Sequence, residues 1–391
     1  MLDVNLFRTG KADLVRESEL HRFAAVELVD EVIALDDAWR RQRFNLDKVR
    51  QELNAASKRI GKLMTATGNQ DEEETKKLME HTNGIKKRQA AMETEVDEAK
   101  AALDAKLMAV GNILHKSVPI CDDEANNVVL RRIGDQRMEE GLKNHRDLCV
   151  MLDIADLKKG AAAAGGRGYK LMQTPHMMTK EAMAKCAQLS QYDEELYKLE
   201  GEGKFLIATK EAGSHGRDTA GIFRTHEFQK IEQFCITSPD GDCSWEMLEE
   251  MIKNSEDFYR ELGIAGQVVN VVSGALNNAA AKKYDLEGWF PASKAYRELV
   301  SCSNCTDYQA RRLGITYGQR RRDERCKKYV HTLNSTLTAT ERTLCCILET
   351  YQKEDGVEVP KVLQPFMCGI EFLPFKKTVD GKPDARSKSN K

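Results

Sequence analysis

The fold is decided by the stretch Lys210–Cys235, which reads KEAGSHGRDTAGIFRTHEFQKIEQFC. Its first half is rich in glycine and small polar residues, which predicts a loop. Residues 221–237 contain no proline and many β-branched and aromatic side chains, which predicts a strand. Because side chains alternate along a strand, Arg224, Phe228 and Glu232 are expected on one face.

The spacing on this face suggests a ligand of defined length. At a rise of about 3.3 Å per residue, Phe228 and Glu232 would lie roughly 13 Å apart. This is close to the span of an aminoacyl-adenylate from its purine to its amino group. The pattern by itself also suits an ordinary amphipathic strand with one solvated face, and pattern alone favours that simpler interpretation.

Three segments carry a resemblance to a known family. The stretch Glu-Ala-Gly-Ser-His-Gly-Arg-Asp, followed by Phe-Arg-x-His-x-Phe-x-Lys-x-Glu, resembles the second signature motif of class II aminoacyl-tRNA synthetases in its seryl-tRNA synthetase form. Residues 293–304 (SKAYRELVSCSN) resemble that family's metal-binding strand, and residues 331–349 (HTLNSTLTATERTLCCILE) resemble its third motif. The third motif is more similar to the eukaryotic cytosolic branch than to the bacterial one.

The resemblance covers nearly the whole chain and implies a fold, a reaction and partners. The implied fold class is α+β, with an N-terminal antiparallel two-helix coiled coil and a C-terminal catalytic domain built on an antiparallel sheet. The implied enzyme is a serine–tRNA ligase and a homodimer. It would use ATP and Mg²⁺ to form seryl-adenylate and then transfer the seryl group to tRNA(Ser).

On the ATP side, the resemblance assigns roles to five residues. Phe228 would stack on adenine, and Glu211 would accept the hydrogens of the adenine amino group. Arg342 would neutralise the β- and γ-phosphates, and Glu298 would hold Mg²⁺ with help from Ser301, so that Arg342 and Glu298 are the implied catalytic residues. Oxygen ligands and phosphate suit a hard cation.

On the serine side, the resemblance assigns four residues. Glu232 would bind the ammonium group and the hydroxyl of serine, and Asn334 and Thr336 would complete the pocket. Thr209 would contact the ammonium. Each of the assigned residues also has a simpler interpretation, such as a core aromatic for Phe228 or a surface carboxylate for Glu298. His226 is interpreted as structural, and Glu341 stands where many relatives carry an uncharged residue.

The sequence departs from the family at two junctions. Thr209 stands where the family has an arginine that grips the α-phosphate, and the order of segments around 165–169 jumps across the place of the first motif. The run at 210–217 matches the second motif best, so Glu211 is assigned there. The missing arginine favours an alternative function, a non-catalytic RNA-binding paralogue of the same fold. A synthetase-like enzyme that charges a carrier protein is a further alternative, but it would have no use for a long basic arm.

Two hydrophobic heptad series predict the arm. The first runs without a break from Leu28 to Leu63, and five such heptads predict a helix of roughly 50 Å. The second begins at Ile85, shifts by one residue after Leu103 and continues to Leu114. Two long helices joined by a short tip form a hairpin.

Basic residues lie toward the distal half of this hairpin. Basic side chains on a helix are usually only solvated, but beside the family motifs they are expected to contact the phosphates of tRNA. The expected tRNA-binding residues are Lys58, Arg59, Lys62, Lys86, Lys87 and Arg88.

Bulk properties agree with a cytoplasmic protein of more than one domain. The 391 residues exceed the usual size of one hydrophobic core. The 60 basic and 62 acidic residues nearly cancel, so a nucleic-acid site must be a local patch. The 11 cysteines have no framework spacing, and Cys302-x-x-Cys305 is weak evidence for zinc. No run is long and apolar enough for a signal peptide or a membrane span.

The domain boundaries follow from these segments. The expected domains are a coiled-coil arm at 1–118, a catalytic domain at 119–375 and a charged flexible tail at 376–391. Within the catalytic domain, residues 119–135 are expected to form a polar connector. A helix is expected at 244–262 and a strand at 263–273.

Overall fold

The structure is a computed structural model. It describes residues 1–66, 72–152, 177–179, 182–183, 185, 204–206, 222–223, 228–318 and 327–379, with only the backbone at 62–66, 72–75, 177 and 204–206. The chain folds as two compact units, Met1–Ile113 and Leu114–Lys391.

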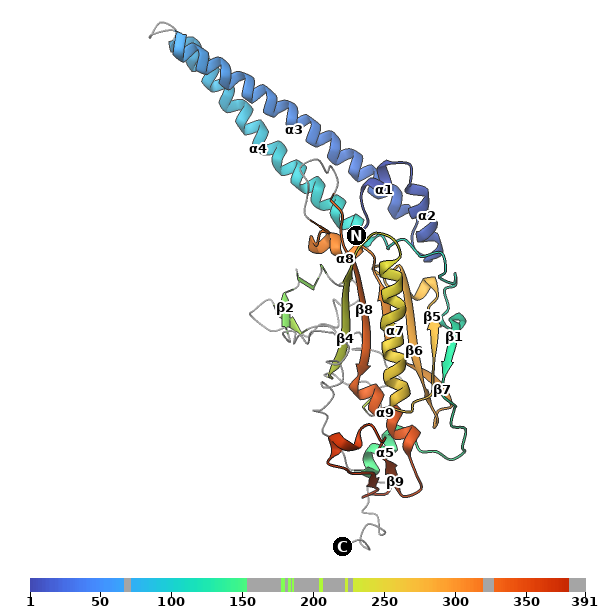
Figure 1. The fold of residues 1–391 in the computed structure, drawn as a ribbon. Coiled ribbons are helices and arrows are strands. Elements are labelled where there is room, and N and C mark those ends of the chain that lie inside the picture. Colours follow the sequence, from blue (N-terminus) through green and yellow to red (C-terminus); the bar gives the residue numbers. More distant parts are fainter. Residues whose placement is uncertain are drawn as a thin grey trace. The chain divides into compact units, whose positions relative to one another are not determined.

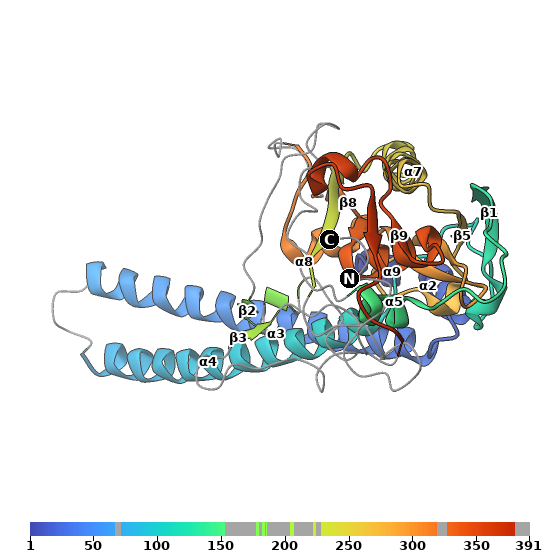
Figure 2. The same ribbon diagram turned by 90° about the horizontal axis from the view of Figure 1, so that it is seen from below.

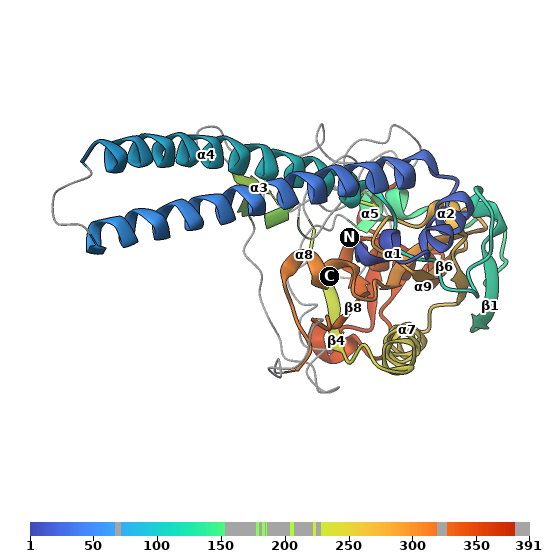
Figure 3. The same cartoon turned by 90° about the horizontal axis from the view of Figure 1, so that it is seen from above.

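The first unit is helical. Two short helices, α1 (Asn5–Arg8) and α2 (Ala12–His21), precede the long helices α3 (Glu27–Ala66) and α4 (Glu72–Ala109). Figures 2 and 3 show α3 and α4 side by side and antiparallel, as the hairpin prediction requires. Every described side chain of the two heptad series is buried or half-buried, with Val32, Leu46 and Leu103 among the most deeply buried.

The second heptad series does not continue to Leu114 as expected, because α4 ends at Ala109. The base of the arm is instead closed by hydrogen bonds around the next residues. The Gly111 amide donates to Glu19 Oε1 over 2.9 Å, and Arg22 Nε donates to the Asn112 carbonyl over 2.9 Å. A Cβ on Gly111 would lie 2.8 Å from the Arg22 side chain, so a larger residue here would have to displace that side chain.

The second unit is built on a six-stranded antiparallel sheet in the order β1-β5-β6-β7-β8-β4. Its strands are β1 (Val128–Ile133), β4 (Lys230–Thr237), β5 (Gly266–Asn270), β6 (Lys282–Phe290), β7 (Ala295–Asn304) and β8 (His331–Ala339). This confirms the predicted antiparallel α+β domain. Smaller elements are η1 (Glu124–Asn126), α5 (His145–Leu152), β2 (Met177–Thr179), β3 (Lys204–Leu206), η6 (Ser273–Ala275), α8 (Tyr308–Leu313), β9 (Gly356–Glu358), η7 (Gln364–Met367) and β10 (Phe372–Pro374).

Helix α7 (Cys243–Glu261) covers one face of the sheet, and α9 (Thr340–Tyr351) follows β8 directly (Figure 1). The apolar stripe of α7 includes Leu248, Met251 and Ile252, all fully buried in the main core. This amphipathic pattern is what predicted a helix at 244–262. The helix therefore covers one face of β4, β8 and β7 and leaves their other face free of α7.

Two sequence predictions about strands were wrong in extent. Among the described residues of the strand expected at 221–237, only Lys230–Thr237 form a strand. The connector expected at 119–135 contains β1, an edge strand whose Val128, Val129 and Leu130 are exposed. Exposure removes the alternation of buried and solvated residues that identifies a strand in a sequence. At the other end, the Lys376 and Lys377 amides donate to the Met151 carbonyl, two residues into the expected tail.

Glycine makes the close contact between β5 and β6 possible. A Cβ on Gly266 would lie only 2.6 Å from the Glu287 carbonyl oxygen, which is backbone and cannot rotate away. We therefore expect Gly266→Ala to destabilise the second unit by about 1–3 kcal/mol. Calorimetric thermal unfolding measures the effect.

The matched control is Gly84→Ala on α4, where an added Cβ meets nothing within 4 Å. This variant should stabilise the helix by about 0.5–1 kcal/mol, since glycine loses more backbone entropy than alanine. A Gly266→Ala protein that unfolds at the parental temperature would contradict the proposed packing.

Candidate active site

The register of the sheet brings the predicted site residues together. Glu232 on β4 pairs with Thr336 on β8, although the two lie 104 positions apart. Asn334 on β8 pairs with Ser303 on β7, two residues beyond Ser301. Because β4, β8 and β7 are adjacent, residues from three distant segments meet on neighbouring strands.

These residues lie on the face of the sheet opposite α7. Cys302 Sγ donates to the Leu248 carbonyl, and Gln233 Nε2 donates to the Met251 carbonyl, so both of these side chains point to α7. Side chains alternate along a strand, so their neighbours point the other way. The neighbours on the free face include Glu232, Ser301, Asn334 and Thr336.

The Glu232 carboxylate is partly satisfied and partly free. Its Oε1 accepts a hydrogen bond from Thr336 Oγ1 over 2.7 Å and an ion pair from Lys230 Nζ over 2.6 Å. Its Oε2 is buried and accepts no hydrogen bond from any described residue. A buried acceptor without a partner is costly, so Oε2 is a natural partner for the ammonium or hydroxyl of a ligand.

Arg342 lies in the first turn of α9, beside Glu298 of β7. Its Nη1 donates to the Glu298 carbonyl over 2.9 Å and lies 4.0 Å from the Glu298 carboxylate. The Arg342 side chain is only 11% exposed. Burial lowers its pKa, but a guanidinium titrates so far above neutrality that the group stays cationic.

Glu298 and Ser301 provide oxygen donors that fit Mg²⁺. The Glu298 side chain is 45% exposed, and Asp285 beside Ser301 has a buried Oδ1 with no partner among the described residues. Within the described ranges, no three His, Cys, Asp or Glu side chains form a group that could hold a metal ion. Oxygen donors of this kind suit a hard cation such as Mg²⁺.

Phe228 is half-buried and lies two residues before β4, outside the sheet. The register also shifts between Ile231 and Glu232. Phe228 is therefore not part of the strand. The alternation of side chains along a strand, which was the basis of the prediction, cannot place it on the same face as Glu232. Four other residues named from the sequence (Thr209, Glu211, Arg224 and His226) lie outside the described residues.

Several polar residues of this face were not predicted. Lys283 and Asp285 on β6 form a buried ion pair of 3.0 Å. Burial disfavours the Lys283 ammonium, but the carboxylates of Asp285 and Glu298 outweigh burial and raise its pKa. The signal was present in the sequence, since Lys283, Asp285 and Glu287 alternate with apolar residues in a central strand.

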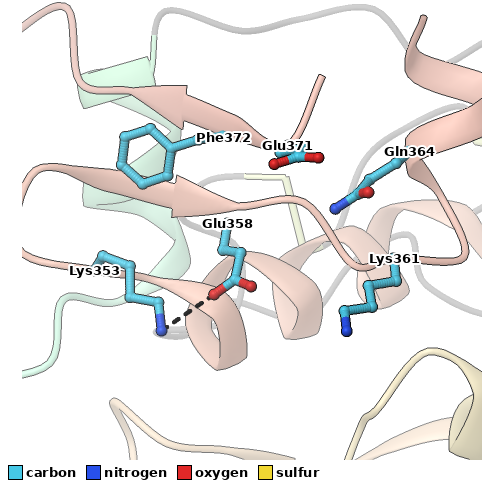
Figure 4. A pocket seen from close by; sticks show the side chains of 6 residues that line it. All are labelled: Lys353, Glu358, Lys361, Gln364, Glu371 and Phe372. Atoms are coloured by element: carbon cyan, nitrogen blue, oxygen red, sulfur yellow. Dashed lines mark ion pairs between the residues drawn. The ribbon is translucent and has the colours of Figure 1, made fainter. Parts of the chain in front are cut away.

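The second unit also has a pocket that is lined by other residues than the candidate active site (Figure 4). Lys353 and Glu358 form an ion pair of 3.1 Å on its wall. The other lining residues are Lys361, Gln364, Glu371 and Phe372. None of the predicted site residues lines it, so it is separate from the candidate active site.

Comparison with known proteins defines the class of this protein. The family model for the tRNA synthetase class II core domain (G, H, P, S and T) matches residues 210–351. Together with the antiparallel sheet and its polar face, this match makes the chain a class II aminoacyl-tRNA synthetase. The model for the seryl-tRNA synthetase N-terminal domain matches residues 1–114.

Full-length relatives identify the particular family. The chain is 52% identical to the cytoplasmic serine–tRNA ligase of Arabidopsis thaliana, covering 96% of this chain and 97% of that protein. It is 44% identical to the cytoplasmic enzyme of Dictyostelium discoideum, covering 96% and 95%. The chain therefore belongs to the seryl-tRNA synthetase family, which confirms the predicted family and the predicted ATP-dependent ligase.

Solved structures agree in fold. The cytoplasmic serine–tRNA ligase of Naegleria fowleri in complex with AMP superposes with a TM-score of 0.78 at 40% identity, covering 96% of this chain and 99% of that one. The seryl-tRNA synthetase of Pyrococcus horikoshii complexed with ATP gives 0.81 at 33% identity, covering 96% and 100%.

The chain is shorter than its relatives inside the aligned region. The alignment with the Arabidopsis protein spans 441 positions, and this chain has 391 residues, so at least 441 − 391 = 50 aligned positions have no residue here. Within the described part of the chain, none of the helices is both long and apolar enough to span a membrane.

Glu341, next to Arg342, is an acid that is only 1% exposed. Burial raises its pKa to about 7, although its own backbone N–H and the charge of Lys230 oppose the shift. The folded state therefore binds a proton that the unfolded chain releases at lower pH. The contribution to stability is complete below about pH 4.5 and is lost as pH rises through about 7.

Glu341→Gln removes this titration. We expect the variant to be more stable than the parent by about 1–2 kcal/mol at about pH 8 and nearly equal at about pH 4.5. Thermal melts at both values measure the difference, with the exposed Glu250→Gln on α7 as the control. An equal effect of Glu341→Gln at both pH values would show that the carboxyl is not protonated in the fold.

Proposed function

We propose that the protein activates L-serine with ATP to seryl-adenylate and transfers the seryl group to the 3′ end of tRNA(Ser). The observation that carries the proposal is the pairing of Glu232 with Thr336, which leaves Glu232 Oε2 free on the site face. The Glu298–Arg342 contact supplies a cation and oxygen donors close to the end of β8. Family membership supports the same reaction.

The first step needs positioning more than acid–base chemistry. The serine carboxylate attacks the α-phosphorus of ATP in line, and pyrophosphate leaves. Arg342 would bind the β- and γ-phosphates through N–H donors, while the half-buried Phe228 would stack on adenine. Bound Mg²⁺, held by Glu298 and Ser301, would neutralise phosphate charge. Most of the rate would come from orientation and charge stabilisation.

Selection of serine follows from the polar groups of the pocket. Glu232 and Thr336 already bond to each other, and Asn334 on the same strand as Thr336 adds an amide. Serine would satisfy the free acceptor of Glu232 with its ammonium and the other polar groups of the pocket with its hydroxyl. Alanine lacks the hydroxyl and would leave a buried polar group unpaired, and threonine would be excluded by lack of space.

In the second step, the terminal adenosine hydroxyl of tRNA would take the acyl group. The N-terminal arm would hold the tRNA through phosphate and shape contacts. Lys58, Lys86 and Lys87 are exposed and form no ion pair with another described residue. Arg88 differs because it is paired across the hairpin with Glu52. The arm lysines are therefore the better candidates for RNA contact.

A homodimer is the assembly we propose. No other described strand pairs with the outer side of edge strand β1, which exposes Val128, Val129 and Leu130. An apolar, unpaired edge is a liability unless another surface covers it.

The cytoplasmic location expected from the sequence agrees with the names of the relatives. None of the relatives named above is described as non-catalytic.

Removal of the Glu232 carboxylate tests the serine pocket. We expect Glu232→Ala to lower serine-dependent ATP–pyrophosphate exchange by at least about 100-fold, because a charge-assisted contact to the ammonium is lost in a buried pocket. The control is Glu250→Ala, an exposed carboxylate on α7. Near-normal exchange in Glu232→Ala would remove this residue from the site.

Neutralisation of the arm tests the tRNA interface separately. We expect the triple variant Lys58→Ala, Lys86→Ala, Lys87→Ala to raise the apparent KM for tRNA about tenfold or more at moderate salt, with adenylate formation unchanged. A charge-matched control replaces exposed lysines of the second unit: Lys253, Lys328 and Lys361. Equal effects of the two triple variants on the tRNA KM would argue against the arm.

A further inference from the structure

Phe223 is a buried aromatic residue that the proposed mechanism does not use. Its side chain is only 4% exposed and belongs to the main core. The guanidinium carbon of Arg342 lies 5.1 Å from the centre of its ring, and that of Arg297 lies 5.2 Å away. Both distances are within the range of a cation–π interaction. One ring therefore contacts two arginines, and the second directly precedes Glu298.

The ring is itself held in place by a second aromatic layer. Phe290 packs edge-on against Phe223, with ring centres 5.6 Å apart and an interplanar angle of 79°. His145 contacts both rings and is fixed by Glu349, whose Oε1 lies 2.8 Å from His145 Nδ1. Edge-to-face packing and this anchor restrict the orientation of Phe223.

A ring suits an arginine that must bind phosphate. A carboxylate partner would occupy the N–H donors of the guanidinium in its plane. An aromatic face attracts the cation above that plane and leaves donors available. Arg342 Nη1 donates to the Glu298 carbonyl over 2.9 Å. The ring and the carbonyl together define the position of the guanidinium.

We propose that Phe223 is a positioning residue that holds the Arg342 guanidinium, with Arg297 beside it, in the orientation that binds the phosphates of ATP. The ring attracts two neighbouring cations through its face and not through their N–H groups. The inference rests on the proposed role of Arg342 in ATP binding. A core aromatic without this role would affect folding but not the handling of ATP.

The test compares two replacements of Phe223 in ATP–pyrophosphate exchange. Phe223→Met keeps an apolar side chain of similar size and removes the ring, and Phe223→Tyr keeps the ring. We expect the methionine variant to lose about tenfold in kcat/KM for ATP, while its KM for serine stays within about twofold. The tyrosine variant should restore kcat/KM for ATP to within about threefold of the parent.

The matched control is Phe375→Met. Phe375 is also 4% exposed and also lies within cation–π distance of a basic group, Lys143 at 5.4 Å, but it belongs to a different core cluster. We expect this variant to lose stability without losing kcat/KM for ATP. A Phe223→Met enzyme with parental kcat/KM for ATP, or a tyrosine variant as impaired as the methionine one, would overturn the proposal.

Two further measurements keep the result interpretable. If Phe223→Met does not fold, a series of fluorinated phenylalanines at position 223 keeps the shape and weakens the ring quadrupole. Activity should then fall with each added fluorine, and a flat series would reject the proposal. Arg342→Ala separates the two hypotheses. If it abolishes exchange while Phe223→Met does not, only the positioning role fails; if it leaves exchange intact, the proposed phosphate site fails as well.

Discussion

The candidate site depends on the double pairing of β8, which hydrogen-bonds to β4 on one side and to β7 on the other. A shift of one residue in the register of a strand would turn the site residues of that strand toward α7. The register therefore fixes Glu232 opposite Thr336 and Asn334 opposite Ser303. Helix α9 begins where β8 ends, so the same strand also delivers Arg342. One strand thus joins the amino-acid side of the site to the phosphate side.

The two faces of the sheet differ in how their buried polar groups are paired. On the α7 face, apolar side chains bury surface, and polar groups such as Gln233 are hydrogen-bonded within the core. On the site face, Glu232 Oε2 and Asp285 Oδ1 are buried without partners among the described residues. Unpaired buried acceptors lower stability, and a bound ligand recovers that loss. The fold supplies the stability that lets the site keep its acceptors free.

The sequence predicted the structure correctly where a hydrophobic repeat extends over many residues. The heptad series predicted both long helices, and all their described core positions are at least half-buried. It failed where exposure hides the pattern, as in β1, and where the chain enters the sheet only after a motif has begun, as at Phe228. The pairing of Glu232 with Thr336 was expected only through family resemblance. No local pattern could place Phe223 beside two arginines, because ring–cation contacts arise from tertiary packing.

A crystal structure with a non-hydrolysable seryl-adenylate analogue would test the central claim most directly. The account predicts that the ammonium of the analogue contacts Glu232 Oε2, that its seryl hydroxyl lies near Thr336, and that Arg342 and Glu298 face the phosphate end. An analogue bound in any other place, or bound with Glu232 still paired only to Lys230 and Thr336, would contradict it.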